Sequence, residues 1–181
     1  MRHLRASLWL AALLAVTGCA STPPAAQAQG TSGTIEAVNH THWAINWFSV
    51  DGRNAVDIIG PYQGGGGACC FAVPAQWRPG MTVRVDWETG ASGMSKLADE
   101  FPGFADEVKY DAWLKKVNAE KRQHSQLVPI PDYSGQEACG ITVHFLPCDQ
   151  LKVTTSCLTY DNPNYPIKEP LKMVEPKACP T

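Results

Sequence analysis

Short stretches in which apolar and polar residues alternate recur along the chain, and this pattern predicts a domain built mainly of β-strands. In residues 81–87 every second side chain is apolar, as expected for a strand with one face in the core. Residues 141–146 and 151–157 repeat the alternation, with His144 on the polar, outward face. Further strands are expected in four shorter apolar runs, at residues 34–38, 43–50, 55–59 and 69–73.

One segment, residues 105–122, has helical rather than strand periodicity. It contains no Pro or Gly, and apolar residues recur at i, i+3, i+4 and i+7, namely Tyr110, Trp113, Leu114 and Val117. Because this segment lies between strands, we expect an inserted helix that packs across the sheet. The expected fold is therefore mainly β (α+β): an antiparallel β-sandwich-like domain with one inserted helix, stapled by disulfides.

Turn-forming residues separate these segments. The chain contains 15 Gly and 14 Pro among 181 residues, which favours short strands over a helical bundle. Residues 51–52 (Asp-Gly) and 147–150 are placed to close hairpins, and the glycine-rich stretch 60–67 is expected to interrupt regular structure. Five prolines follow Asp161, so we expect the C-terminal tail to run extended over the surface.

The first 18 residues have the composition of a secretory signal peptide. Arg2 and Arg5 give a positive start, and residues 8–16 form an apolar run about half as long as a bilayer span requires. Residues 16–19 (VTGC) resemble the lipobox of bacterial lipoproteins. The resemblance implies cleavage before Cys19 and acylation of its thiol, so that lipid holds the mature chain on a membrane.

The segment from the lipidated cysteine to residue 33 is predicted to be a flexible tether, because residues 20–33 carry no charge and no large apolar side chain. No aspartate follows Cys19, which by similarity to lipoprotein sorting signals indicates the outer membrane, facing the periplasm. Residues 34–181 then form a single domain with a Pro-rich tail. The mature chain has 13 basic and 17 acidic side chains, a net charge of −4, so nucleic acid is not an expected partner.

Six cysteines remain after Cys19, an even number that is typical of exported, disulfide-bonded domains. A hairpin over residues 147–150 would place residue 146 opposite residue 151, and residue 139 beside residue 157. Cys139–Cys157 is therefore an expected disulfide.

Cys69 and Cys70 are adjacent in a predicted strand, where neighbouring side chains point to opposite sides. We therefore expect them to take different partners, for which Cys148 and Cys179 are available. The cysteine spacing contains no CxxC pair, so a zinc site is not expected.

His40 and His42 are the one candidate metal pair, since residues at i and i+2 share a face of a strand. Asp51 or Asp57 could complete such a site. Short histidine pairs before a strand more often make hydrogen bonds in a turn, and this interpretation is favoured. The sequence has no GxSxG motif and no other recognisable nucleophile–base arrangement, so we assign no catalytic residue and expect no cofactor.

Five residues are candidates for contact with a partner. Gly64, Gly65 and Gly66 belong to a QGGGGA run that lacks the Gly-Lys-Ser/Thr ending of a phosphate loop, so the favoured interpretation is a bent or closely packed backbone and the second is a contact loop. Trp77 could stack with Arg78 beside a Pro-Gly turn and anchor an interface.

Several clustered motifs form a recognisable set: residues 39–41 (NHT), 64–70 (GGGGACC), 77–80 (WRPG), 128–133 (VPIPDY) and 144–147 (HFLP). As a set, covering roughly residues 34–157, they resemble a family of bacterial envelope lipoproteins that carries a domain of unassigned function. Some members are encoded beside type VI secretion lipase effectors, and at least one is regarded as the immunity protein of such a phospholipase. The resemblance implies a periplasm-facing inhibitor that binds a toxin, and it carries over no catalytic residue.

Three functional hypotheses follow from the sequence. The first is an outer-membrane lipoprotein that binds and neutralises a secreted antibacterial phospholipase. The second is a structural or assembly lipoprotein of the cell envelope, without a toxin partner. The third, and least favoured, is a metal-dependent hydrolase that uses His40 and His42.

Overall fold

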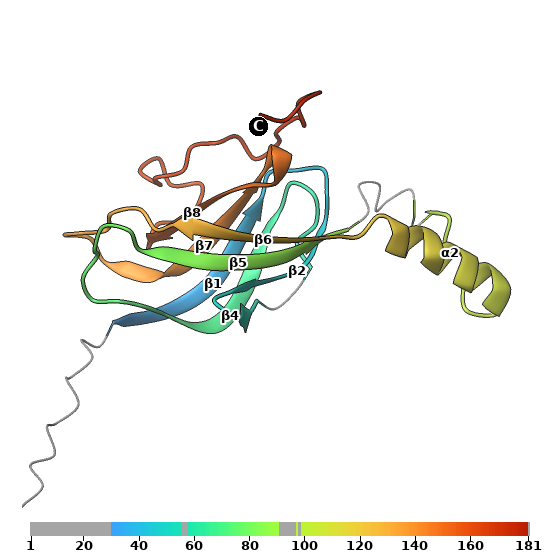
Figure 1. The fold of residues 1–181 in the computed structure, drawn as a ribbon, viewed down its shortest axis with the longest axis horizontal. Coiled ribbons are helices and arrows are strands. Elements are labelled where there is room, and N and C mark those ends of the chain that lie inside the picture. The colour runs from blue at the N-terminus through green and yellow to red at the C-terminus, as the bar shows by residue number, and fades with distance from the viewer. Residues whose placement is uncertain (1–29, 56–57, 91–96, 98, 181) are drawn as a thin grey trace, which may run out of the picture.

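The computed structural model describes residues 30–55, 58–90, 97 and 99–180 of the chain. Within these residues, eight strands form two four-stranded sheets that share one hydrophobic core (Figure 1). The strand order is β4-β1-β7-β8 in the first sheet and β3-β2-β5-β6 in the second. The mainly β, sandwich-like fold expected from the sequence is therefore confirmed.

The first sheet consists of β1 (Thr31–Asn39), β4 (Gly64–Val73), β7 (Ala138–Leu146) and β8 (Gln150–Ser156). The second consists of β2 (Ile45–Val50), β3 (Arg53–Asn54), β5 (Thr82–Thr89) and β6 (Arg122–Pro129). Helix α2 (Glu107–Ala119) lies between β5 and β6 in the chain, and the 3-10 turn η1 (Pro147–Asp149) joins β7 to β8. Strand β1 begins three residues earlier than expected, so Thr31 to Gly33 belong to the domain and not to the tether.

The alternation in β5 and β7 places their apolar side chains in the core, as predicted. The inward residues are at most 3% exposed: Val83, Val85, Trp87, Ile141, Val143 and Phe145. Phe48 of β2 meets Phe145 edge-on, with ring centroids 5.4 Å apart, and this contact joins the two sheets. Full burial of such side chains stabilises the fold by roughly 1.5–3 kcal/mol each.

Strands β1 and β7 pair in parallel, in contrast to the other strand pairs of the described residues, which are antiparallel. No hairpin sets their direction, because β2 to β6 lie between them in the chain. The pairing places the end of β1 beside the end of β7, with Val38 opposite His144 and Asn39 opposite Phe145.

The glycine-rich stretch interrupts regular structure at residues 60–63, as predicted, but not at residues 64–67. Gly64 to Gly67 are the first residues of β4, and Gly64 to Gly66 pair with β1. Gly66 and Gly67 have φ angles of 112° and 110°, which side-chain-bearing residues rarely adopt. A Cβ atom on Gly66 would lie 2.7 Å from the carbonyl oxygen of Ile35. The glycines therefore allow a close approach of two backbones, which is the favoured interpretation of this run.

The strand expected at residues 55–59 is largely absent from the described residues. The Asp51-Gly52 turn leads into the two-residue β3, and Ile59 forms an isolated bridge with Ile45. Residues 56 and 57 lie outside the described part of the chain.

The helix is shorter than predicted and does not pack across a sheet. Asp106 caps its first turn by accepting a hydrogen bond from the backbone nitrogen of Lys109, and the helix ends at Ala119. No residue of α2 is buried, and the helix projects beyond the end of the sheets (Figure 1).

Strand β6 follows at Arg122 and was not predicted, because its mostly polar sequence (RQHSQLVP) lacks alternation. Its structure comes from eight consecutive residue pairs with β5, from Thr89–Arg122 to Thr82–Pro129. As an edge strand with most residues exposed, it tolerates a polar sequence.

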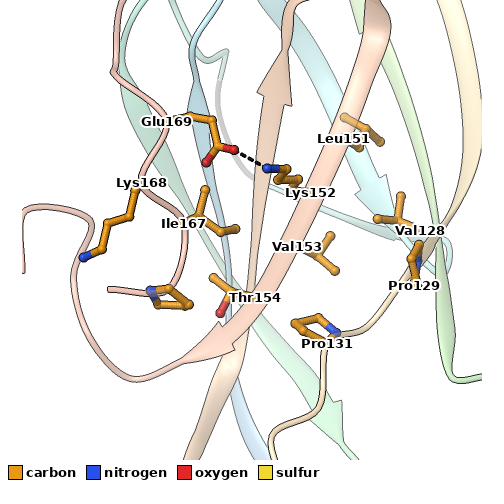
Figure 2. A pocket seen from close by; sticks show the side chains of 11 residues that line it. Val128, Pro129, Pro131, Leu151, Lys152, Val153, Thr154, Ile167, Lys168 and Glu169 are labelled. Atoms are coloured by element: carbon orange, nitrogen blue, oxygen red, sulfur yellow. Dashed lines mark hydrogen bonds and ion pairs between the residues drawn. The ribbon is translucent and has the colours of Figure 1, made fainter. Parts of the chain in front are cut away.

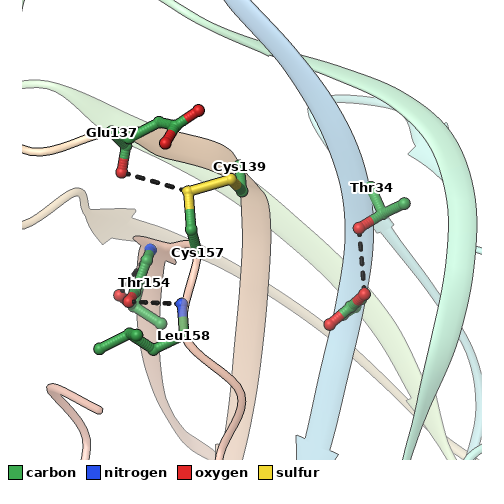
Figure 3. The surroundings of a disulfide bond; sticks show 8 residues. Thr34, Glu137, Cys139, Thr154, Cys157 and Leu158 are labelled. Carbon is green, nitrogen blue, oxygen red and sulfur yellow. Dashed lines mark hydrogen bonds between the residues drawn. A yellow bond between two sulfur atoms is a disulfide. The ribbon is translucent and has the colours of Figure 1, made fainter. Parts of the chain in front are cut away.

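The hairpin between β7 and β8 is tighter than predicted, since Leu146 pairs with Gln150 rather than with residue 151. The turn is closed by Cys148 and Asp149, which have φ angles of 63° and 55°. A register shift between Ala138 and Thr142, near the other end of the hairpin, offsets this change in strand pairing. The expected Cys139–Cys157 disulfide is formed there, with Cα atoms 4.8 Å apart (Figure 3).

Two further disulfides occur in the described residues, and they correct the predicted pairing. Cys69 and Cys70 are bonded to each other, and Cys148 is bonded to Cys179 with Cα atoms 5.4 Å apart. The expectation that adjacent cysteines take different partners applies to regular strands. Here Phe71 pairs with Gly33 and Cys69 with Thr34, so Cys70 lies in a β-bulge and the regular alternation does not hold.

The C-terminal tail, from Cys157 onward, contains neither helix nor strand in its described residues and runs extended over the molecule, as predicted. It is held by the Cys148–Cys179 disulfide and by a hydrogen bond from the backbone nitrogen of Met173 to the carbonyl oxygen of His40. No helix among the described residues is long and apolar enough to cross a membrane.

We expect peptide mapping of the mature, non-reduced protein to show the linkages Cys69–Cys70, Cys139–Cys157 and Cys148–Cys179. Mass spectrometry of digests before and after reduction measures this directly. A peptide that links Cys69 or Cys70 to Cys148 or Cys179 would contradict the structure and restore the pairing expected from the sequence.

Candidate functional site

A chain of hydrogen bonds joins two buried histidines to the C-terminal tail. His40 follows β1 and His144 lies in β7, so the parallel pairing of these strands brings the two rings together. Nε2 of His40 is 2.8 Å from Nδ1 of His144, and Nε2 of His144 is 2.7 Å from the hydroxyl of Tyr165. At the other end, Nδ1 of His40 is 2.9 Å from the carbonyl oxygen of Pro170.

The direction of this chain follows from its last acceptor. The carbonyl oxygen of Pro170 can only accept, so Nδ1 of His40 donates and Nε2 of a neutral His40 accepts. Nδ1–H of His144 then donates to His40, and Nε2 of His144 accepts from Tyr165. In this arrangement both imidazoles are neutral, and every ring nitrogen has a partner.

The surroundings favour these neutral forms. Burial and, to a smaller extent, the neighbouring His40 lower the pKa of His144 to about 3, while Glu169 opposes the shift. Burial also lowers the pKa of His40, against the effect of the Pro170 carbonyl. Burial raises the pKa of the Tyr165 hydroxyl to about 12.

Neither histidine is placed for catalysis, since both rings are 0% exposed. The predicted outward position of His144 is correct for the face of the sheet but wrong for its environment, because the tail covers this face. Tyr160 packs edge-on against His40, with ring centroids 5.6 Å apart. The arrangement fixes the tail on the first sheet and is structural.

The predicted histidine metal pair is not formed. His40 lies in the buried chain, whereas His42 is partly exposed and leans on the ring of Trp43, with centroids 4.9 Å apart. Asp51 accepts a hydrogen bond from the backbone nitrogen of Arg84 in a turn, and Asp57 lies outside the described residues. The residues are separated because His40 to His42 form a bend and not a strand, so the i, i+2 rule does not apply.

Cysteine and acidic residues do not offer a metal centre either. The two groups of potential ligands in the described part of the chain are Glu137 with Cys139 and Cys157, and Cys148 with Glu175 and Cys179. Both depend on sulfur atoms that are already committed to disulfides.

The candidate partner-binding residues lie in two separate hollows. The first hollow, of about 370 Å³, is lined by Gly64, Gly65 and Gly66 together with Tyr160 and Tyr165 of the tail. Trp77 lines another, of similar volume, with residues of the loop that follows Tyr133. The structure therefore does not unite these residues in one contact surface.

Trp77 has a structural role that the sequence did not indicate. Its indole nitrogen donates to the carbonyl oxygen of Ile130 at 3.0 Å, and the ring packs partly buried against the core. The expected stacking of Arg78 on Trp77 is not formed. Among described residues, cation–π contacts join Arg122 to Trp43 and Lys172 to Tyr62.

A groove of about 700 Å³ runs along β8, between the end of β6 and the tail (Figure 2). Val128, Pro129 and Pro131 form one wall, and Ile167 stands on the other side of β8. Its charged groups are Lys168 and an ion pair between Lys152 and Glu169, and this pairing lowers the pKa of the Glu169 carboxyl. Apart from these charged groups the lining is mostly apolar, and none of the residues named for the groove forms a nucleophile–base pair.

Two large, highly exposed apolar side chains lie close together on the segment between β5 and β6, residues 97–121, which we call the arm. Thr89 pairs with Arg122, so the arm leaves the second sheet at the end of a hairpin. Phe104 and Val108 are each 79% exposed. The described part of this segment comprises residue 97 and residues 99–121, including α2.

Aromatic side chains pack against one another on the arm rather than against the sheets. Phe101 contacts both Phe104 and Trp113, with ring centroids 5.0 Å apart in each case, and Tyr110 lies 5.5 Å from Phe104. The indole nitrogen of Trp113 donates to the carbonyl oxygen of Leu97 at 2.8 Å. This cluster gives the arm a local core and leaves much of its apolar surface in water.

Sequence reasoning found part of this cluster but assigned it the wrong role. The helical spacing of Tyr110 and Trp113 predicts a face directed at the sheet. Phe101 and Phe104 lie before the helix, and in the sequence only their position on either side of Pro102-Gly103 sets them apart. The buried Tyr165 gave no signal, since its burial depends on how the tail folds back.

We expect the free energy of unfolding to fall as the pH drops from 6.5 towards 3. The unfolded chain binds a proton on His144 below about pH 6.5, whereas the folded chain resists protonation down to about pH 3. His144 alone should contribute a slope of about 1.4 kcal/mol per pH unit. Urea denaturation followed by tryptophan fluorescence at several pH values measures it.

The variant His144→Gln should lose the contribution of His144 to the pH dependence of the unfolding free energy. The variant His42→Gln should keep it, because His42 does not belong to the buried chain of hydrogen bonds. Equal slopes in wild type and His144→Gln would show that the buried histidines do not govern acid stability.

Comparison with known proteins agrees in part with the resemblance drawn from the sequence. A family model described as "Protein of unknown function (DUF3304)" matches residues 38–153, from the end of β1 into β8. The match spans His40, the arm and His144, and it ends before the tail. Searches of curated proteins and of solved structures gave no match. Because the family model covers more than half of the sequence, the chain belongs to the DUF3304 family.

Proposed function

We propose that this protein is a lipid-anchored envelope protein, facing the periplasm, that acts by binding another protein, and that its partner is a secreted antibacterial phospholipase which it neutralises. The observation that carries the proposal is the arm, whose aromatic cluster is exposed on a projection from a stable hairpin. Exposed apolar groups that cluster in this way mark interaction sites.

The shape and chemistry of the arm favour a protein partner. Aromatic side chains are enriched among residues that dominate binding energy, and they act best when a partner encloses them. A single helix with its preceding turn is convex, so its complement is concave. An enzyme that acts on lipids has such a surface, because its substrate has apolar chains.

The rest of the domain suits a stoichiometric inhibitor. Disulfides at both ends of β8 restrict the scaffold, and a preorganised scaffold loses less entropy on binding. A lipid on Cys19 would keep the domain within reach of the membrane through the short segment before β1, which raises its effective concentration where a lipase attacks.

Removal of apolar surface from the arm should abolish protection. We expect Phe104→Ser combined with Val108→Ser to weaken binding to the lipase encoded by the neighbouring gene at least about 30-fold, the effect of losing about 2 kcal/mol at a hot spot. Calorimetry with the mature domain measures affinity, and survival of a deletion strain under attack measures immunity.

The matched control is Val174→Ser, because Val174 is 89% exposed but lies in the tail. Wild-type affinity in the arm variant would rule out the arm as the binding surface. If the wild-type domain does not bind the lipase and its deletion causes an envelope defect without a toxin, the protein is a structural or assembly lipoprotein instead.

The lipid anchor is tested separately. We expect Cys19→Ser to abolish incorporation of labelled palmitate and to move the protein out of the membrane fraction, because the acyl chains provide the attachment. Gln27→Ala, in the same segment, should remain labelled. Mass spectrometry that finds residues 1–18 intact, or Cys19 without lipid, would contradict the anchor.

A further inference from the structure

Charge is distributed unevenly along the arm. Residues 99–111 include five carboxylates and one lysine, whereas residues 112–122 include four basic side chains and one acidic one. The helix begins at Glu107, at the end of the arm away from the sheets, and returns toward β6 (Figure 1). The outer end of the arm is therefore acidic, and its base beside the sheet is basic.

The acidic groups at the outer end adjoin the exposed apolar residues. Glu107 precedes Val108 directly, and Asp106 lies two residues after Phe104. Two carboxylates are neutralised within the arm, since Asp106 pairs with Lys109 at 2.9 Å and Glu100 pairs with Lys116 at 3.2 Å.

Glu107 and Asp111 are exposed, and neither takes part in an ion pair among the described residues. Glu107 and Asp111 are neighbours on the helix surface at positions i and i+4, and Asp111 lies one turn after Val108, at i+3. The outer end thus presents an apolar surface flanked by net negative charge.

This charge argues against insertion into a membrane. Bacterial leaflets that contain anionic lipid repel carboxylates, and peripheral helices that bind them carry Lys and Arg beside their apolar face. The favoured partner of the arm is a protein that has a cleft with an apolar interior and a basic rim. Such a cleft complements both the apolar surface and the negative charge of the arm.

We propose that the outer end of the arm, with Phe104 and Val108 flanked by Glu107 and Asp111, mimics an anionic phospholipid and occupies the substrate cleft of the phospholipase. This inference rests on the proposed function. A phospholipid combines apolar chains with a phosphate, and an enzyme that binds it must accommodate both. The arm offers the same combination on a rigid helix.

The packing of the arm supports this use. Phe101 and Tyr110 both contact the ring of Phe104, and Trp113 packs against Phe101. The hydrogen bond from Trp113 to Leu97 ties the helix to the incoming chain. A rigid mimic loses little conformational freedom when it enters a cleft. No covalent step is needed, and inhibition is by occupation of the cleft alone.

Mimicry of substrate predicts competitive inhibition. The experiment is a steady-state assay of the lipase with phosphatidylglycerol in detergent micelles, at several concentrations of the mature domain. We expect the apparent KM to rise in proportion to the inhibitor concentration while kcat stays constant. Glu107→Gln combined with Asp111→Asn should raise the inhibition constant at least about 10-fold, and its effect should shrink at high salt.

The matched control is Glu120→Gln, which removes an exposed carboxylate at the base of α2 and should leave the inhibition constant unchanged. A fall in kcat at constant KM, with binding intact, would overturn the mimicry and leave the proposed function standing. Equal inhibition by the charge-neutral variant would overturn it as well. Absence of any binding to the lipase refutes the proposed function itself.

A second measurement separates the membrane from the protein as occupant. The mature domain without its lipid is mixed with vesicles of phosphatidylethanolamine and phosphatidylglycerol, in the absence of lipase, and its tryptophan fluorescence is recorded. We expect no change. A blue shift that is lost in the Phe104→Ser, Val108→Ser variant would show that the arm enters lipid, and it would overturn the proposal.

Discussion

The parallel pairing of β1 and β7 is the constraint on which the rest of the domain depends. These strands are the two inner members of the first sheet, and their inward side chains meet those of the second sheet in one core. On the opposite face the same pairing sets His40 beside His144, which hold Tyr165 and Pro170 of the tail. One strand pair thus supports a hydrophobic core on one side and a polar, fully hydrogen-bonded layer on the other.

That polar layer illustrates how a buried imidazole can be stable. Each ring nitrogen has a donor or an acceptor with a fixed role, so burial does not leave an unsatisfied polar atom. The cost falls on His40, because a proton added at its Nε2 would face the Nδ1–H of His144 and break the hydrogen bond between the two rings. Residues that would suit catalysis by type are therefore committed to holding the tail on the sheet.

The sequence predicted those parts of the fold that depend on local pattern. The inward faces of β5 and β7, the extended tail and the Cys139–Cys157 pair follow from alternation, proline content and hairpin geometry. Strand β6 could not be predicted, because an exposed edge strand takes its structure from the partner and not from its own residues. The role of α2 was missed for a related reason: periodicity shows that a helix has an apolar face, but not whether that face meets the sheet, its own preceding turn or another molecule.

The tail carries a further consequence of its covalent connections. Cys157 bonds to Cys139 at the start of the tail, and Cys179 bonds to Cys148 near its end. A protease that cut any peptide bond between these two cysteines would leave both fragments attached to the same body. Digestion of this surface segment would therefore change the conformation of the protein without dividing it.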